Sequence, residues 1–440
     1  MIVKDGAASL RRCLESVAPL VDRIVLGDTG STDDTVAIAR SFGAEILSVP
    51  WQNDFSHARN CVLQHSRCDW ILVLDADEML DATAIPLLPQ TIAQAHPQAN
   101  LAAYDLWRWN YVSTTNSRSG DQGALANPLL VACSRPYPAF VRSLNTRLFR
   151  RHPGIFFERP VHENVAESVQ ALGLSRSLAT FVIHHFGQAE DSLQTRLRKN
   201  DLYDRIGAQH LRSNPTDHRN HFELGLVQLE HYRSPERALP HFIQAAQLNP
   251  HNAEARLFVG ICHLRLNRFE LALTALAQSE QIAPHSIVLH EALGDAHFHC
   301  QDYRRAAQDY TRAHTLGGTS ALIEAKRGAC EVHLGQTAQG LARVERALQR
   351  EPSFAELYDV ASATALLAGN LPLAARIAVQ RTALARTTAF HFTFAAALSE
   401  SSGDPNRARA LLQQGLAHFP ANTALQQAIL ECPLDPTPPC

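Results

Sequence analysis

The sequence predicts an α/β domain in the first half of the chain and an all-α array of repeats in the second half. Two observations support this division. Over residues 1–190, short apolar runs alternate with stretches that have a helical pattern, as they do in βαβ units. From about residue 218, prolines and small residues recur every 34 residues, which indicates stacked pairs of helices.

The first strand and helix of the α/β half come from short local patterns. Met1 to Lys4 predicts a strand so short that we expect either a start further upstream or a frayed domain edge. Ile24–Leu26 predicts the second strand. Ser31 or Thr32 then caps a helix that ends at Gly43, and acidic residues in its first turn suit the helix dipole.

Two more strands and a second helix follow. Ala44–Val49 predicts a strand, and Ser56 caps a helix that continues to about His65. Trp70–Leu74 is a continuous apolar run, which is typical of a strand buried on both faces in the middle of a parallel sheet. The alternation predicts a three-layer α/β domain that binds ligands at the carboxyl ends of its strands.

Three ladders of residues define the repeats. The small residues of the first ladder are Gly260, Gly294, Gly328 and Ser362. Those of the second are Ala238, Ala272, Ala306, Gly340, Ala374 and Ala408. Prolines between the helix pairs are Pro250, Pro284, Pro352 and Pro420. Small residues where helices touch and prolines between pairs, at this period, are the tetratricopeptide signature, repeated here about six times.

These patterns divide the chain into four segments. We expect the α/β domain over residues 1–205, a linker over 206–217, repeats over 218–429 and a proline-rich tail over 430–440.

Composition excludes several classes of protein. The formal net charge is -3 and no basic block is present, which argues against a nucleic-acid partner. No signal peptide is recognisable, and the longest strongly apolar run is too short to span a bilayer. The nine cysteines are scattered without a CxxC pair, so neither disulfides nor a zinc site is expected. We expect a cytoplasmic protein without a transmembrane segment.

The strongest candidate site is Asp75-Ala76-Asp77-Glu78, directly after the predicted buried strand. Carboxylates one residue apart at a strand end can present oxygens to one hard divalent cation, which in turn can bind a diphosphate. An isolated pair of this kind is more often a solvated turn. Here Asp28 follows another strand and Arg59 lies in the first turn of a helix, where it can reach a phosphate.

These motifs together resemble glycosyltransferase family 2, of the GT-A fold, and within it the branch that contains the bacteriocin S-glycosyltransferases. The matching segments are Val3-Lys4-Asp5, Asp28-Thr29-Gly30-Ser31-Thr32-Asp33, Phe55–Asn60, Trp70–Glu78, Arg147–Arg150, Val161-His162-Glu163 and His184-His185-Phe186-Gly187. One departure is Gly6, at a position where relatives usually carry an acid. The resemblance implies a Rossmann-like nucleotide-diphospho-sugar transferase domain, of bacterial type, followed by the tetratricopeptide superhelix.

The resemblance also implies roles for individual residues. Those expected to bind the nucleotide-sugar are Asp5, Asp28, Asp33, Arg59 and Asp75. Asp77, Asp75 and His185 are expected to hold Mn²⁺ or Mg²⁺, with His184 as a second choice for the histidine. Asp77 and Glu163 are the catalytic candidates, Glu163 as general base, although a strand-edge acid is an equally weighted interpretation of Glu163.

The implied reaction is direct displacement at the anomeric carbon with inversion, from a nucleotide-sugar, with UDP-sugars favoured. Protein, peptide, glycan and lipid-linked acceptors all stay open, and the repeats tilt the expectation toward a protein or peptide. Trp107, Trp109 and Tyr111 alternate along one strand face, either as a platform for a sugar ring or as core. Residues 114–127 have the composition of a lid.

One alternative belongs to another class of function. Tetratricopeptide arrays bind peptides and protein segments, so the chain is alternatively a scaffold whose first domain is inactive. The repeats are expected to recruit an acceptor or to mediate self-association, for example as a homodimer. Metal-dependent binding of a nucleotide-sugar separates the two hypotheses, since a pure scaffold shows none.

Overall fold

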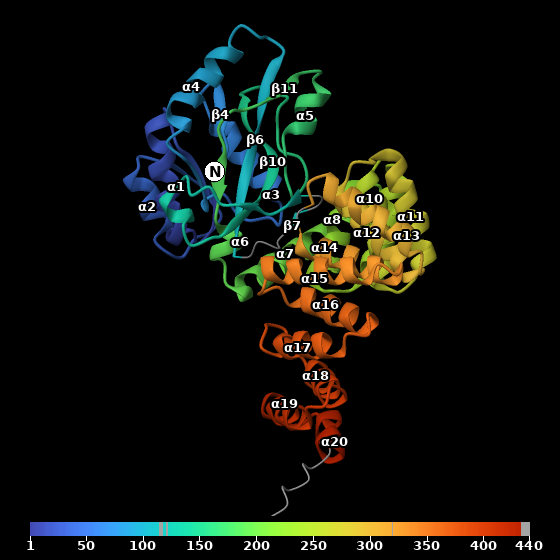
Figure 1. Ribbon diagram of the computed structural model, residues 1–440. Coiled ribbons are helices and arrows are strands. Elements are labelled where there is room, and N and C mark those ends of the chain that lie inside the picture. Colours follow the sequence, from blue (N-terminus) through green and yellow to red (C-terminus); the bar gives the residue numbers. More distant parts are fainter. Residues whose placement is uncertain (114–117, 120–121, 319, 433–440) are drawn as a thin grey trace, which may run out of the picture. The chain divides into compact units, whose positions relative to one another are not determined.

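The structure, a computed structural model, describes residues 1–113, 118–119, 122–318 and 320–432 (Figure 1). The chain divides into two compact units, Met1–Asn249 and Pro250–Cys440. The first unit contains the α/β domain and the first helices of the array, and the second contains the remaining helix pairs. Among the described helices, none is long and apolar enough to cross a membrane.

The α/β domain contains two main sheets rather than one. The first is parallel, in the order β1-β2-β3: β1 (Ile2–Val3), β2 (Val25–Asp28) and β3 (Glu45–Ser48). Each of these three strands is followed by a helix: α1 (Ala7–Val17), α2 (Thr35–Ser41) and α3 (Phe55–His65), respectively. α4 (Ala84–Ala95) comes later, after the first two strands of the second sheet.

The second sheet is mixed and has the order β4-β10-β6-β12-β5. Its strands are β4 (Trp70–Leu72), β5 (Glu78–Leu80), β6 (Leu101–Val112), β10 (Ala139–Arg150) and β12 (Ile183–His185), with β9 (Leu125–Ala126) paired to β10 and β11 (Ser175–Leu178) paired to β6. β10 runs antiparallel to β4 and β6, whereas β12 runs parallel to β6 and antiparallel to β5. β7 (Arg118–Ser119) and β8 (Gln122–Gly123) pair antiparallel, and α5 (Ala166–Ala171) and α6 (Gly187–Glu190) are short helices.

The strand predicted at Trp70–Leu74 exists, but its expected place in the middle of a parallel sheet is wrong. β4 lies at an end of the second sheet and pairs antiparallel with β10. The two-residue β1 pairs only with β2 in the described sheets, and a cavity of about 330 Å³ lies between β1 and β4. Val73 and Leu74 are buried, while the three residues of β4 are half-buried.

Both predicted helix caps are wrong by two or three residues. α2 begins at Thr35, because Ser31 and Asp33 use their side chains to accept hydrogen bonds from the backbone of Asp5 and Ala7. These hydrogen bonds keep residues 31–34 in a non-helical conformation. α3 is capped by Asp54, whose carboxylate accepts from the backbone N–H of His57 at 2.9 Å.

An apolar core holds α4 against the second sheet. Leu80, Leu106 and Phe181 in this core are almost completely buried, and Leu88 reaches it from α4. On the other face of the sheet, a second cluster joins Phe149 and Phe157. Burial on both faces fixes the sheet rigidly, so the loops that leave the strand ends start from defined positions.

All further elements are helices. The first unit ends with α7 (Leu193–Ser213), α8 (His218–Leu226), the π-helical turn Val227–His231 and α9 (Pro235–Leu248). The second unit comprises α10 (Ala253–Arg265), α11 (Phe269–Ile282), α12 (Ile287–His299), α13 (Tyr303–Thr315), α14 (Ala321–His333), α15 (Thr337–Arg350), α16 (Ala355–Leu367), α17 (Leu371–Thr382), α18 (Ala389–Ser401), α19 (Pro405–His418) and α20 (Thr423–Glu431).

The small-residue ladders lie where paired helices touch, as predicted. A Cβ atom added at Gly328 in α14 would lie 2.7 Å from the carbonyl oxygen of Gly340 in α15. Gly294 and Gly260 make room in the same way for Tyr310 and Leu276 of the following helices. Backbone contact at this range leaves space for no side chain, which explains the spacing of the ladder.

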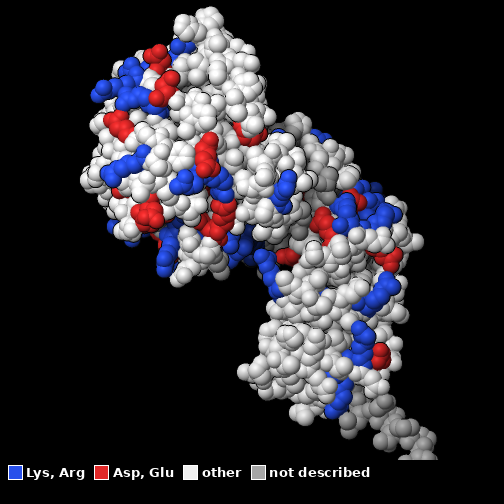
Figure 2. Space-filling model, turned by 90° about the vertical axis from the view of Figure 1, so that its left-hand side faces the viewer, with Lys and Arg blue, Asp and Glu red and all other residues white. Residues whose placement is uncertain are grey.

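Charged residues are unevenly distributed over the repeats. On the face in Figure 2, the lower helices carry Lys, Arg, Asp and Glu along one edge and leave a broad uncharged surface beside it. On the same face of the α/β domain, both signs of charge are interspersed (Figure 2).

We predict that Gly340→Val destabilises the array. The added side chain meets the carbonyl oxygen of Gly328, and overpacking of this kind costs about 2 kcal/mol. The melting temperature of the full chain, followed by circular dichroism, should fall. Gln349→Ala, at an exposed position of the same helix, is the control and should leave it nearly unchanged. Equal melting temperatures for Gly340→Val and wild type would contradict the close helix contact.

Candidate active site

Asp75 follows β4 and is held between two buried arginines. Its Oδ1 accepts from Arg59 Nη2 at 2.6 Å, and its Oδ2 accepts from Arg147 Nη2 at 3.0 Å. Burial alone would raise the pKa of Asp75, but the two guanidinium groups outweigh it and hold that pKa well below its usual range. Asp75 is therefore ionised, and each of its carboxylate oxygens already accepts a hydrogen bond from an arginine.

Glu78 is a third acidic residue of the site, and it binds Arg147 and Arg108. Its side chain is fully buried and accepts from Arg147 at 3.1 Å and from Arg108 at 3.4 Å. It also accepts from the backbone N–H of Asp75 at 2.9 Å, which fixes the turn between β4 and β5. Glu78 is thus a buried counter-ion of the two arginines, and its bond to the backbone of Asp75 orients Asp75 and Asp77 in the turn.

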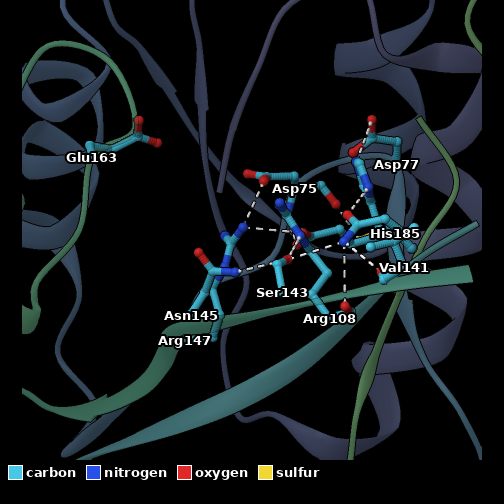
Figure 3. Close-up of polar contacts among 12 residues, drawn as sticks. Asp75, Asp77, Arg108, Val141, Ser143, Asn145, Arg147, Glu163 and His185 are labelled. Atoms are coloured by element: carbon cyan, nitrogen blue, oxygen red, sulfur yellow. Dashed lines mark hydrogen bonds and ion pairs between the residues drawn. The ribbon is translucent and has the colours of Figure 1, made fainter. Parts of the chain in front are cut away.

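Asp77 and His185 face each other on one side of Asp75 (Figure 3). His185 Nε2 lies 3.4 Å from Asp77 Oδ2. The other ring nitrogen, Nδ1, lies 2.8 Å from the Oδ1 atom of Asn110, whose amide nitrogen donates to Val141 and Ser143. This network makes Nδ1 the donor and turns Nε2 toward the carboxylate.

The arrangement suits a divalent cation. With a proton on Nδ1, Nε2 meets the carboxylate across either a second proton, which makes the ring positively charged, or a bound cation. Burial alone would raise the pKa of Asp77, but the hydrogen bond and charge of His185 lower it. Across the described part of the chain, no three His, Cys, Asp or Glu side chains gather as a metal site. A cation held here would take Asp77 and His185 as two of its ligands, with the others from solvent or from a bound phosphate.

His184, the second choice for the metal site, points to the opposite face of β12. It is completely buried, its Nδ1 lies 2.8 Å from the Tyr111 hydroxyl, and its Nε2 lies 3.3 Å from Asp81. Trp109 packs against the His184 ring at a centroid distance of 5.5 Å. His184 is thus part of the core, and it holds β12 so that His185 faces the acids.

Glu163 lies across Asp75 from the Asp77–His185 pair (Figure 3). Its Oε1 accepts from Arg59 Nε at 2.5 Å, so one guanidinium group holds both Asp75 and Glu163. Arg59 is 8% exposed, and its Nη1 has no hydrogen-bond partner among the described residues. A buried donor without a partner is available to an anion that enters the site.

The loop that carries Glu163 is held in an unusual conformation. Arg159 and His162 have left-handed backbones, with φ of 74° and 55°. Arg159 Nε lies 3.8 Å from Asp217 Oδ2, and His162 Nε2 lies 3.5 Å from Glu223 Oε2 of α8. Contacts with the first helices of the array therefore secure both sides of the loop.

The predicted nucleotide-binding acids lie on two loops that are bonded to each other. Asp5 Oδ1 accepts from the backbone N–H of Thr32 at 2.7 Å, and Asp33 accepts from that of Ala7 at 3.0 Å. Asp28 closes its own turn by accepting from the backbone of Ser31 at 3.0 Å. A Cβ at Gly6 would lie 3.3 Å from that of Ala76, so these loops border the acidic turn.

Comparison with known proteins identifies the α/β domain. Residues 1–153 match the model of glycosyl transferase family 2, and residues 232–296 match a tetratricopeptide repeat model.

Residues 1–153 are thus a glycosyl transferase family 2 domain.

Curated relatives carry the same combination in part. A TPR repeat-containing protein of Synechococcus elongatus is 39% identical over 44% of this chain and 43% of its own length. An uncharacterized glycosyltransferase of Rickettsia felis is 36% identical over 24% of this chain and 37% of its own. The SPbeta prophage-derived glycosyltransferase SunS of Bacillus subtilis is 37% identical over 18% of this chain and 19% of its own length. The chain thus covers less than half of each relative.

Among solved structures, a tetratricopeptide repeat protein from Parabacteroides merdae aligns with 53% of this chain and 92% of its own length. The TM-score is 0.44 at 14% sequence identity.

The glycosyltransferase domain brings together some predicted site residues and separates others. Arg59, Asp75 and Glu163 form one bonded group, and Asp77 meets His185. Asp5, Asp28 and Asp33 stay on the neighbouring loops without a direct bond to either. Trp107, Trp109 and Tyr111 lie on the sheet face opposite Asn110, where Tyr111 is core, so they form no platform at this site. Within the predicted lid, residues 114–117 and 120–121 lie outside the described residues.

The sequence did not reveal three residues of the site. Asn110 orients His185 from β6, Arg108 binds Glu78, and Gly187 lies directly behind the Asp77 carboxylate. A Cβ at Gly187 would collide with Asp77 Oδ2 and would lie 3.0 Å from His185 Nε2. Only Gly187 had a local signal, because it ends the motif that contains the two histidines.

We predict that Gly187→Ala weakens the binding of Mn²⁺ to the glycosyltransferase domain at least about tenfold. The methyl group must displace the Asp77 carboxylate from His185, while the fold persists because the residue lies at the site rather than in the core. Titration followed by electron paramagnetic resonance measures the affinity, and circular dichroism checks the fold. Unchanged Mn²⁺ affinity in a folded variant would exclude the Asp77–His185 pair as the cation site.

We predict that Asp75→Asn destabilises the domain by about 3 kcal/mol, because it leaves Arg59 and Arg147 each short of a buried counter-ion. The lowered pKa of Asp75 contributes stability that is present above about pH 4, the unfolded value, and is lost as the pH falls further. Urea unfolding between pH 3 and pH 7 should therefore show a weaker acid dependence in the variant. Asp69→Asn, an exposed acid next to β4, is the control. A variant as stable as this control would show that the ion pairs contribute nothing.

Proposed function

We propose that the chain is an inverting, metal-dependent glycosyltransferase that moves a sugar from a nucleotide-sugar, with UDP-sugars favoured, to an acceptor. The observation that carries the proposal is the Asp77–His185 pair, at 3.4 Å and oriented by Asn110, beside a buried arginine with an unused donor. The match of residues 1–153 to glycosyl transferase family 2 supports the same reaction class.

In this proposal, the acids and arginines bind the donor. Asp77 and His185 hold Mn²⁺ or Mg²⁺, which when bound takes up negative charge on the departing nucleoside diphosphate. The Nη1 group of Arg59, which has no hydrogen-bond partner among the described residues, donates a hydrogen bond to the nucleotide-sugar. The bonded loops of Asp5, Asp28 and Asp33 contact the nucleoside. Asp75 keeps both arginines in place, and a direct bond from Asp75 to the cation would require one of its ion pairs to open.

Glu163 is the proposed general base. Direct displacement needs the base on the side of the anomeric carbon opposite the leaving group, and Glu163 lies across Asp75 from the Asp77–His185 pair (Figure 3). The ion pair with Arg59 orients the carboxylate, and a carboxylate is the form of the side chain that accepts the acceptor's proton. An acceptor hydroxyl or thiol that binds beside Glu163 gives up its proton as it attacks.

The repeats are proposed to present the acceptor. Tetratricopeptide arrays commonly bind protein segments, which favours a protein or peptide acceptor over a glycan. Self-association through the array, as a homodimer, is the other proposed role. The segment boundaries at residues 205, 217 and 429 and the cytoplasmic location stay predictions.

Calorimetric titration of the full chain tests the proposal. The titrants are UDP, UDP-glucose, UDP-N-acetylglucosamine and GDP-mannose, each with and without Mn²⁺. We expect one donor to bind only with Mn²⁺ and Asp77→Asn to lose that binding. Glu163→Gln should keep donor binding and lose transfer by about a hundredfold or more. Glu15→Gln, on the exposed face of α1, is the control. If no nucleotide binds under any metal condition, the scaffold hypothesis replaces this one.

A further inference from the structure

We propose that α7, which lies outside the segment that matches the transferase family, supplies two further contacts to the donor: Lys199 to its diphosphate and Tyr203 to the sugar that is transferred. The inference rests on the proposed function and names residues that bind the same donor. α7 spans Leu193–Ser213, whereas the family match ends at residue 153. Both side chains belong to the compact unit that contains the acids.

The spacing of the two residues places them on one face of α7. Lys199 and Tyr203 are four residues apart, which is about one helical turn. Tyr203 packs against Phe55 at the start of α3, with ring centroids 5.7 Å apart, and against His162 at 5.8 Å. Because His162 precedes Glu163, this face of α7 borders the proposed base.

Tyr203 packs against His162, the residue next to the proposed base, and its phenol is also affected by the charges of the acidic turn. Burial raises the pKa of its phenol to about 12, and the charges of Glu163, Asp75 and Asp77 raise it in the same direction. All three carboxylates therefore lie within electrostatic reach of one hydroxyl. The reacting carbon must lie between base and leaving group, so the sugar ring occupies the region that this hydroxyl borders.

The chemistry of Tyr203 suits a sugar. Its hydroxyl stays protonated at neutral pH and has no hydrogen-bond partner among the described residues, so it is free to donate to a sugar oxygen. Its ring offers a flat apolar surface to the C–H face of a pyranose. A tyrosine with only a packing role would need neither the free hydroxyl nor the acidic surroundings.

Lys199 is the cation with the freedom to meet a diphosphate. Arg59, Arg108 and Arg147 are all bound to acids of the site. Among the described residues, Lys199 Nζ binds only Asp191, at 2.7 Å, and its side chain is 45% exposed. Its charge is one of those that lower the pKa of Asp77, after the larger effects of burial, His185 and Asp75. Asp191, which holds the ammonium group, donates its backbone N–H to the carbonyl of Gly187 at 2.9 Å, and Gly187 lies directly behind the Asp77 carboxylate. The ammonium group therefore lies on the side of the site that carries the cation ligands, and its exposed side chain is able to move toward phosphate oxygens.

Charge balance favours this role. The four acids Asp75, Asp77, Glu78 and Glu163 face three arginines, so the site without ligand has an excess of one negative charge among these groups. A nucleoside diphosphate adds further negative charge. The divalent cation and Lys199 together offset it, and Lys199 is the only lysine between Lys4 and Lys326.

Titration of the full chain with UDP and Mn²⁺ tests Lys199. We expect Lys199→Gln, which keeps the length and removes the charge, to raise the dissociation constant of UDP about tenfold. Arg205→Gln is the matched control, since it removes a charge from an exposed position about 120° around the same helix from Lys199. UDP binding by Lys199→Gln that equals the control's would overturn the assignment.

Titration with UDP and with the UDP-sugar that wild type binds tests Tyr203. Tyr203→Phe keeps the ring against Phe55 and removes only the hydroxyl. We expect unchanged binding of UDP and about fivefold weaker binding of the UDP-sugar. Equal loss for both ligands, or no loss for either, would overturn the sugar contact. Wild type that binds no nucleotide would refute the proposed function itself, whereas normal wild-type binding with unaffected α7 variants refutes this inference alone.

Discussion

The site depends on two buried arginines that hold its acids in place. Arg59 and Arg147 bind the two oxygens of Asp75, and they extend to Glu163 on one side and to Glu78 on the other. These residues come from α3, β10, two loops and β5, which are distant in the sequence. Burying so many charges is favourable only when each has partners, so the network ties the geometry of every member to that of the others.

The outer parts of the site follow from this network. Because Glu78 fixes the turn after β4, Asp77 is directed toward His185, which Asn110 holds from β6. Because Arg59 holds Glu163, the proposed base is oriented before any substrate arrives. The core behind β12, with His184 bound to Tyr111 and Asp81, supports the same strand from the other face.

Sequence patterns predicted the elements better than their arrangement. Asp75, Asp77 and Arg59 were found because acids after an apolar strand and an arginine in the first turn of a helix are local signals. Asn110 and Arg108 are ordinary polar residues of a strand, and only the register of β6 with β12 and the turn gives them a role. The parallel order expected around β4 failed because strand neighbours depend on distant segments, here β10. The repeats were predicted more completely, because each helix pair contacts only its sequence neighbours.

The loop of Glu163 bears on how the chain can evolve. Its left-handed residues, Arg159 and His162, are secured by Asp217 and Glu223, which belong to the start of the helical array and lie beyond the family match. Strained backbone persists only where surrounding contacts over-determine it. The first helices of the array thus contribute to the rigidity of the loop that carries the proposed base. Recombination that exchanged the array at residue 205 would therefore also remove the contacts that support this base. The α/β domain and the first helices of the array therefore act as one mechanical unit, even though their folds are unrelated.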